Sequence, residues 1–480
     1  MLFNSLFFLF VFFPLVTGFY YILPHRFRWL WLLFASCYFY MGFVPQYILI
    51  LAFTITVDYF AGILLAKSSG AKKKIILMIS ILSNIGMLFV FKYFNFFNAN
   101  LGALAEIIHW NYSLQSLSWV LPIGLSFHTF QSLSYIIEVY YGRQKVERSF
   151  GIFALYVMFY PQLVAGPIER PQNLLHQFHE KHFFQIERFF SGLRLIIWGL
   201  FKKVVIADRV SIFVNQIFNN PYEYTGAYFV LGTFLFAFQI YCDFSGYSDM
   251  ARGLARTIGF ELMVNFKAPY FSKSISEFWR RWHISLSSWF RDYVYIPLGG
   301  SRVAVWRWQY NLFITFLLSG IWHGANWTYV IWGGLNGFYL VFAIWVDKLS
   351  QKFTQNFKLF GTVYNIYQMI STFILICIAW IFFRAQTVGE AWYILKQIVS
   401  DGYNLSGLWP FLLQYRYSFL IIFGAISFLT FVDYFIAEDK RLEKLFRLPL
   451  FIQVVACLFI VFIIMLLGRF VNEQFIYFQF

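Results

Sequence analysis

The feature that most constrains this chain is a series of apolar runs of about 20 residues, separated by short polar or basic stretches. Only 12% of its 480 residues are charged, whereas a soluble domain carries about a quarter. Backbone polar groups within hydrocarbon must find partners inside their own segment, so such runs form helices. The sequence therefore predicts an all-α, polytopic membrane protein with about 11–12 membrane segments, the length of each set by the bilayer.

The formal net charge of +15 would suit a nucleic-acid binder, but the positions of the charges indicate otherwise. Lysine and arginine concentrate in short loops between apolar runs, as in Lys72–Lys74, which is the positive-inside pattern. We expect membrane lipids, and no nucleic acid, around a single domain over residues 1–480. Residues 92–118 are expected to form a loop, and residues 469–480 an extracytoplasmic tail.

Two segments before residue 190 depart from the simple pattern of spans. Four Pro and Gly residues interrupt the short apolar run at 151–171, which predicts a re-entrant or broken helix. His176, His179 and His182 then recur at three-residue spacing. Helical geometry turns the third imidazole about 120° from the first, so we expect a polar loop rather than a metal site.

Residues 274–297 are expected to form one amphipathic helix along the cytoplasmic face. Ser274 and Glu277 fit a capping box, and Pro297 precedes a glycine pair that ends the helix. One reading is a membrane anchor. The other is that Arg280, Arg281 and Arg291 bind a phosphate-bearing donor from the cytoplasm. On a helical wheel His283 lies at the edge of the apolar arc, so it should face protein or a cavity.

A second histidine, His323, lies in a long apolar run that has no other ionisable residue between Arg307 and Asp347. An ionisable group at such a depth indicates a functional site, because its burial is costly. A lone histidine on an apolar face is more often a core residue. Burial away from water favours the neutral imidazole, however, and this is the form that a general base needs.

Both histidines belong to long motifs. The segment FWRRWHISLSSWFRDYVYIPLGG is followed, about 40 residues after its histidine, by SGIWHGANW, and FYPQLVAGPIERP and YCDFSGYSDMARGLARTIGFELMVNFKAPY lie upstream. These motifs resemble the membrane-bound O-acyltransferase superfamily, in its alginate O-acetylation branch. The resemblance implies a helical bundle around a central funnel, with His323 as catalytic histidine and His283 as its partner within a catalytic segment at 266–332.

The same resemblance implies that acetyl-CoA is the acyl donor. We expect no cofactor and no metal. Trp282, Trp322 and Asn326 join the three arginines as candidate substrate-binding residues, since they lie beside the two histidines. Glu277, Asp243 and Asp249 are nearby ionisable residues for which we expect cap and loop roles.

The C-terminal sequence FIYFQF resembles an aromatic motif of cell-envelope acylation systems. In those systems a tyrosine hydroxyl is thought to carry the acyl group, which makes Tyr477 a third catalytic candidate; a phenol is a competent acyl carrier once a base takes its proton. The other reading of this residue is an interfacial aromatic.

The expected function is acetyl transfer across a bacterial inner membrane to a periplasmic partner protein that O-acetylates a polysaccharide such as alginate or peptidoglycan. An acyltransferase of the same superfamily that modifies a lipid or a protein is an alternative. A transporter or flippase of lipid-linked sugar is another. It should show paired charges within its spans or repeat symmetry, and the sequence shows neither.

Overall fold

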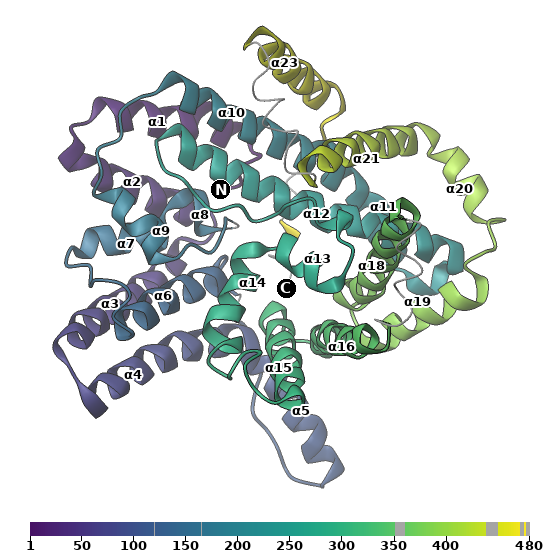
Figure 1. Cartoon of the computed structure of the whole chain (residues 1–480), viewed down its shortest axis with the longest axis horizontal. Coiled ribbons are helices and arrows are strands. Elements are labelled where there is room, and N and C mark those ends of the chain that lie inside the picture. The colour runs from purple at the N-terminus through teal and green to yellow at the C-terminus, as the bar shows by residue number, and fades with distance from the viewer. Residues whose placement is uncertain (120, 165, 351–360, 438–449, 471–474, 477–480) are drawn as a thin grey trace. The chain divides into compact units, whose positions relative to one another are not determined.

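The computed structural model describes the chain except for residues 120, 165, 351–360, 438–449, 471–474 and 477–480. Every regular element in the described part is helical, so the all-α prediction is confirmed (Figure 1). The chain forms two compact units: unit 1 comprises Met1–Ile196 and Tyr247–Met263, and unit 2 comprises Ile197–Gly246 and Val264–Phe480. The expected catalytic segment, residues 266–332, therefore lies entirely within unit 2.

Unit 1 holds the N-terminal helices and the last turns of one long helix that enters it from unit 2. Its helices are α1 (Phe13–Ile22), α2 (His25–Met41), α3 (Ile48–Lys67), α4 (Gly70–Leu88), α5 (Phe94–Ile107), α6 (Leu125–Tyr140), α7 (Phe150–Met158), α8 (Tyr160–Leu163), α9 (Pro171–Leu174) and most of α10 (Ile186–Leu200). The long helix is α12 (Gly226–Thr257).

Unit 2 holds the two candidate histidines. Its helices, besides the first part of α12, are α11 (Asp208–Phe218), α13 (Ile275–Arg281), α14 (Ile284–Phe290), α15 (Val305–His323), α16 (Trp327–Ser350), α18 (Gly361–Arg384), α19 (Val388–Asp401), α20 (Leu408–Gln414), α21 (Arg416–Ala437) and α23 (Leu450–Leu467). A π-helical segment, η5 (Phe201–Ala207), precedes α11.

Six helices in the described residues are long and apolar enough to cross a membrane, and two shorter apolar helices accompany them. The chain is thus a multi-pass membrane protein. Some other apolar runs of the described residues fold as short or interrupted helices. Between Phe150 and Leu174, for example, the chain forms three short helices, α7, α8 and α9, of 9, 4 and 4 residues, as the prolines predict.

One predicted loop is wrong. Residues 92–118, which are nearly free of basic residues, were expected to form a loop between two spans, yet α5 occupies Phe94–Ile107. The apolar helix that begins at Gly70 continues through a π-helical turn to Ile107. The scarcity of lysine and arginine in this region therefore does not indicate a non-helical backbone.

Large apolar side chains cover the outer face of the candidate spans, as expected for contact with lipid. On α23, Phe451 and Met465 are each 77% exposed. On α12, by contrast, 78% of the most apolar window is buried inside the protein. The helix that carries Asp243 is therefore an interior helix, while α23 offers a broad apolar face to the bilayer.

The three histidines of the loop in unit 1 have different partners. His179 Nε2 lies 2.7 Å from a Glu147 carboxylate oxygen, and His182 Nε2 lies 2.9 Å from the Gln177 carbonyl oxygen. His176 lies 3.8 Å from Glu180. Each ring thus serves a separate polar contact in the loop.

Candidate active site

The segment around His283 is not one helix. The Ser274 hydroxyl accepts the Glu277 N–H at 3.2 Å, so the predicted cap is confirmed. The helix ends after seven residues, however, and the chain restarts as α14 after His283 (Figure 1). His283 has a φ of 43° in the left-handed region, where a non-glycine residue is under strain of about 1–2 kcal/mol. The prediction of one continuous helix at 274–297 is therefore wrong.

Asn265 holds this break in place. Its backbone oxygen accepts the Ile284 N–H at 2.9 Å, and its side-chain oxygen accepts the Ser285 N–H at 3.2 Å and the Ser285 hydroxyl at 2.9 Å. A backbone N–H can only donate, so the oxygen of the amide must be the atom that faces Ser285. The side chain of Asn265 thereby replaces the helical hydrogen bonds that the break removes.

The same amide oxygen fixes the tautomer of His283. His283 Nδ1 lies 3.1 Å from Asn265 Oδ1. Because that oxygen is an acceptor, Nδ1 must carry the ring proton, which leaves Nε2 as the basic nitrogen of a neutral imidazole. The ring is 1% exposed and lies against Phe244 at a centroid distance of 4.5 Å. This burial lowers the pKa of His283 to about 3, so the ring is neutral at physiological pH.

His323 is the last residue of α15 and is buried, with 5% of its surface exposed. Aromatic rings surround it: the centroids of Trp322 and Trp332 each lie 4.9 Å away, and that of Phe383 lies 5.4 Å away. All three rings meet the imidazole edge to face. This enclosure fixes the orientation of the ring and excludes water from it.

The position of His323 depends on a close approach of α15 and α16. A Cβ atom added to Gly333 would lie 2.5 Å from the Phe316 carbonyl oxygen, and one added to Gly320 would lie 2.3 Å from the Tyr329 carbonyl oxygen. Only glycine permits backbones to pack at this distance. Gly320 and Gly333 therefore let the end of α15 pack directly against the start of α16. This packing fixes the position of the His323 imidazole.

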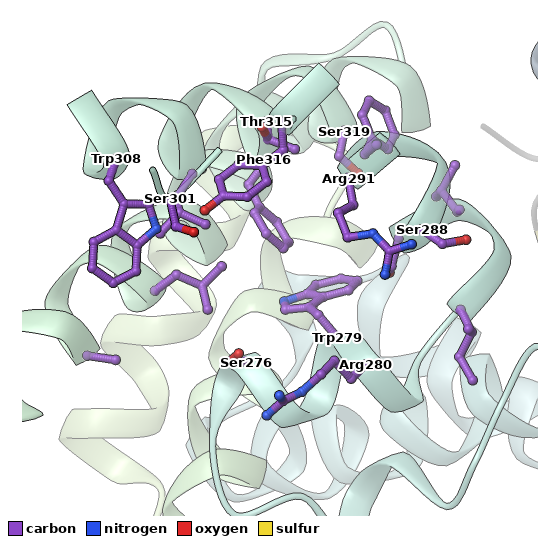
Figure 2. A pocket seen from close by; sticks show the side chains of 18 of the residues that line it. Ser276, Trp279, Arg280, Ser288, Arg291, Ser301, Trp308, Thr315, Phe316 and Ser319 are labelled. Carbon is purple, nitrogen blue, oxygen red and sulfur yellow. The ribbon is translucent and has the colours of Figure 1, made fainter. Parts of the chain in front are cut away.

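A cavity of about 600 Å³ opens beside these elements. Arg280 and Arg291 line it, and in the view of Figure 2 the Trp279 indole lies between their guanidinium groups. Ser319 lines it as well, one helical turn before His323 on α15. The cavity thus joins two cationic side chains to the helix that carries the candidate base. Its full lining is Ser276, Trp279, Arg280, Ile284, Leu286, Ser287, Ser288, Phe290, Arg291, Tyr295, Ser301, Trp308, Leu312, Thr315, Phe316, Ser319, Leu340, Ala343 and Ile344.

Aromatic rings separate this cavity from His323. Trp279 packs against Trp332 at a centroid distance of 5.6 Å, and Trp332 packs against His323. The Trp279 Nε1–H donates to Asn336 Oδ1 at 3.3 Å, which holds the indole in this position. Trp279 therefore forms the wall between the cavity and the imidazole.

A continuous series of ring contacts also runs from His323 to His283. Successive centroids along it are 4.9 to 6.4 Å apart, so the two histidines belong to one packed aromatic core within unit 2. The rings between them are Trp332, Trp380, Trp282 and Phe266.

The other candidate residues have diverse surroundings. Arg281 pairs with Glu277 at 2.6 Å and does not line the cavity described above. Trp282 is buried in the aromatic core, and Trp322 lies against His323. Asn326 bonds to the backbone, donating to the Gln386 carbonyl at 2.9 Å and accepting the Thr328 N–H at 3.1 Å. Of the six binding candidates, Arg280 and Arg291 are those that the cavity brings together.

Tyr477 lies outside the described residues, but Ile476, which precedes it, is buried. The Ile476 N–H donates to Asp243 Oδ2 at 2.8 Å. Asp243 also pairs with the buried Lys203 at 2.7 Å. The loop role expected for Asp243 is therefore wrong: it belongs to an ion cluster inside unit 2. Glu277, in contrast, accepts the Lys273 N–H at 2.8 Å, as a cap residue should.

Comparison with known proteins agrees with this architecture. Residues 149–385 match the membrane-bound O-acyltransferase family. The chain is 38% identical to the probable alginate O-acetylase of Pseudomonas aeruginosa, over 89% of this chain and 82% of that protein. It is 34% identical to the peptidoglycan O-acetyltransferase of Helicobacter pylori, over 85% and 82% of the two chains. The teichoic acid D-alanyltransferase of Bacillus subtilis is 28% identical over 48% of this chain and 61% of its own length.

Both candidate histidines lie within the matched range, and the two O-acetylating relatives cover most of the chain. The multi-pass helical fold agrees with the membrane location that the family description states. This chain therefore belongs to the membrane-bound O-acyltransferase family, and it is an O-acyltransferase.

Proposed function

We propose that this protein passes acetyl groups from cytoplasmic acetyl-CoA across a bacterial inner membrane for O-acetylation of an extracytoplasmic polysaccharide, with a periplasmic protein as partner. The similarity to alginate and peptidoglycan O-acetylating enzymes supports a polysaccharide as the final acceptor. The observation that carries the proposal is the cavity, because it places two arginines at a site contiguous with the helix of His323.

The cavity suits coenzyme A in both size and charge. Its volume of about 600 Å³ lies in the range of small-molecule sites. Arg280 and Arg291 offer planar, permanently charged donors that match phosphate oxygens. The apolar lining from α15 and α16 would accommodate the pantetheine arm, with the thioester directed toward Ser319 and the end of α15. Passage of the acetyl group to His323 would require Trp279 to move aside.

In the proposed reaction His323 acts as general base. It takes the proton of an acceptor hydroxyl, whose oxygen attacks the thioester carbonyl; the intermediate then collapses, and coenzyme A leaves as a thiol with the proton that His323 returns. His283 has its proton on Nδ1, facing Asn265. Its Nε2 can then accept but not donate a hydrogen bond, which supports a role in orienting the hydroxyl over stabilisation of an oxyanion.

We propose that the acceptor hydroxyl is that of Tyr477 or of a serine on the periplasmic partner. Tyr477 follows Ile476 directly in the sequence, and Ile476 is buried in the unit that holds both histidines. A tyrosine that accepts the acetyl group there would relay it to the partner. Tyr477→Phe removes only the hydroxyl, so it tests this step without loss of the ring.

The test is acetyl transfer by the purified protein in proteoliposomes. With acetyl-CoA labelled in the acetyl group on the cytoplasmic face, we expect release of free coenzyme A on that face and labelled ester on the opposite face when partner and polysaccharide are supplied. Label recovered in lipid, or in a protein other than this chain and its partner, would indicate an acyltransferase for a different acceptor. Uptake of a lipid-linked sugar without thioester cleavage would indicate transport and refute the proposal.

A further inference from the structure

A buried ion cluster lies in unit 2, away from the cavity. Lys203, at the π-helical segment before α11, places its ammonium group 2.8 Å from Asp208 and 2.7 Å from Asp243. All three residues are at most 3% exposed. Two carboxylates around one ammonium group leave excess negative charge in a low-dielectric environment, which is costly unless further donors reach the carboxylate oxygens.

The C-terminal segment supplies such a donor. The second oxygen of Asp243 accepts the Ile476 N–H at 2.8 Å, across 233 positions of sequence. Hydrogen bonds from a backbone amide to a carboxylate are about twice as strong as those between neutral groups. The chain is therefore bound at Ile476 by the carboxylate of Asp243, and the ion pair with Lys203 holds that carboxylate in place.

Packing on both sides of this bond directs the segment toward the candidate site. Phe475 is 0% exposed, and its ring lies 5.5 Å from that of Phe244, the residue after Asp243 on α12. Phe244 in turn contacts His283 at 4.5 Å. One ring therefore separates Phe475 from the imidazole. The short yellow segment beside α12 in Figure 1 is this part of the chain.

The region before it is also attached to η5. The Arg469 N–H donates to the Val204 carbonyl at 2.9 Å, and Arg209 donates to the Leu467 carbonyl at 2.6 Å. One backbone bond to η5 and one side-chain bond from α11 thus tie the chain around the end of α23 to the segment that carries Lys203. The segment and the ion cluster are parts of one local structure.

We propose that Asp243, held by Lys203, is a positioning residue that docks Phe475 and Ile476 inside the catalytic unit, one aromatic ring away from His283. This inference rests on the proposed function, in which Tyr477 accepts the acetyl group. Asp243 would act through the Ile476 amide and would touch neither donor nor acceptor.

The first experiment measures docking alone, without acetyl transfer. Hydrogen–deuterium exchange of the C-terminal peptide is followed in the full-length protein in nanodiscs. Asp243→Ala should increase exchange at Ile476 at least tenfold. Asp208→Ala is the matched control, because it removes the other carboxylate from the same ammonium group and leaves the Ile476 bond intact; it should change exchange less than twofold. Equal exchange in the two variants would overturn the proposal.

The second experiment changes the donor instead of the acceptor, and it avoids any buried charge. Ile476→Pro removes the N–H, whereas Ile476→Ala keeps it. We expect Ile476→Pro to lower kcat for acetyl transfer about tenfold or more, with the KM for acetyl-CoA unchanged, and Ile476→Ala to stay within threefold of wild type. Wild-type kcat in Ile476→Pro would overturn the positioning role.

The two hypotheses fail in different ways. If Tyr477→Phe retains full acetyl transfer, the relay is refuted, while the exchange measurement still reports whether Asp243 docks the segment. If the exchange of Asp243→Ala matches that of wild type, docking is refuted whatever the activity of Tyr477→Phe.

Discussion

His283 Nδ1 lies 3.1 Å from the side-chain oxygen of Asn265, and that one oxygen also accepts both polar hydrogens of Ser285. The arrangement couples the tautomer of a buried imidazole to the backbone break that presents it. A strained histidine at a helix start is thus held by a residue 18 positions earlier in the chain.

Asn265→Ala should therefore reduce both activity and stability. It removes the oriented acceptor from His283, so we expect kcat for acetyl transfer to fall by up to about 100-fold, with little change in KM. The loss of a buried acceptor should cost about 1–3 kcal/mol. The control is Asn311→Ala, which removes a buried amide bonded to the Gly300 carbonyl in the same unit. A similar stability loss with normal kcat in the control would separate positioning from folding, and normal kcat in Asn265→Ala would contradict the assignment.

The depressed pKa of His283 predicts acid sensitivity. Its pKa is about 3 in the folded protein because of burial, against about 6.5 when unfolded. Between these values the unfolded state binds more protons, so stability falls as pH drops below about 6.5, by about 2 kcal/mol at pH 5. His283→Gln should flatten this dependence. The measurement is the thermal midpoint in detergent between pH 7.5 and pH 5, and an unchanged slope in the variant would contradict the account.

Arg280 and Arg291 should set the affinity for the donor. Replacement of either with Gln removes a charge from the cavity lining, so we expect the KM for acetyl-CoA to rise about tenfold while kcat changes little. Arg302→Gln is the matched control, since Arg302 lies on the following loop, is exposed and does not line the cavity. Dephospho-coenzyme A thioesters should show smaller differences between the variants. An equal rise in the KM for acetyl-CoA in all three variants would indicate a nonspecific effect of the net charge of the protein and not a binding site.

Two adjacent glycines on α16 should respond differently to alanine. A Cβ on Gly333 would meet the Phe316 carbonyl and the backbone of Gly320, whereas a Cβ on Gly334 has nothing within 4 Å. Gly333→Ala should lower the thermal midpoint and reduce acetyl transfer, because it forces α15 away from α16. Gly334→Ala should be neutral or stabilise the helix by up to about 1 kcal/mol. Identical behaviour of the two variants would refute the close crossing.

Much of the fold could be predicted from the sequence because hydrophobicity and loop charge act locally. The apolar runs that contain α3, α18 and α21 are recognisable as helices without reference to any other part of the chain. The break at His283 is not, since it depends on Asn265, and the pattern on both sides of it still suits a single helix. Periodicity alone could not reveal a partner that lies outside the helix.

The candidate site shows the same division. The motif around His323 identified the family, and the glycines beside the histidine indicated close packing. The cavity, however, is lined by Arg280 and Arg291 but not by Arg281, which pairs with Glu277 one turn earlier on the same helix. Asp243 was misjudged for a related reason: its partners, Lys203 and Ile476, are distant in sequence.

The central claim is that His323 is the general base for acyl transfer, and single-turnover transfer from labelled acetyl-CoA tests it most directly. His323→Gln keeps a polar side chain of similar size, and we expect it to lower the rate of coenzyme A release by at least about 100-fold. His182→Gln, a change at a buried histidine of unit 1, should retain at least half of the wild-type rate. Wild-type turnover by correctly inserted His323→Gln protein would contradict the account.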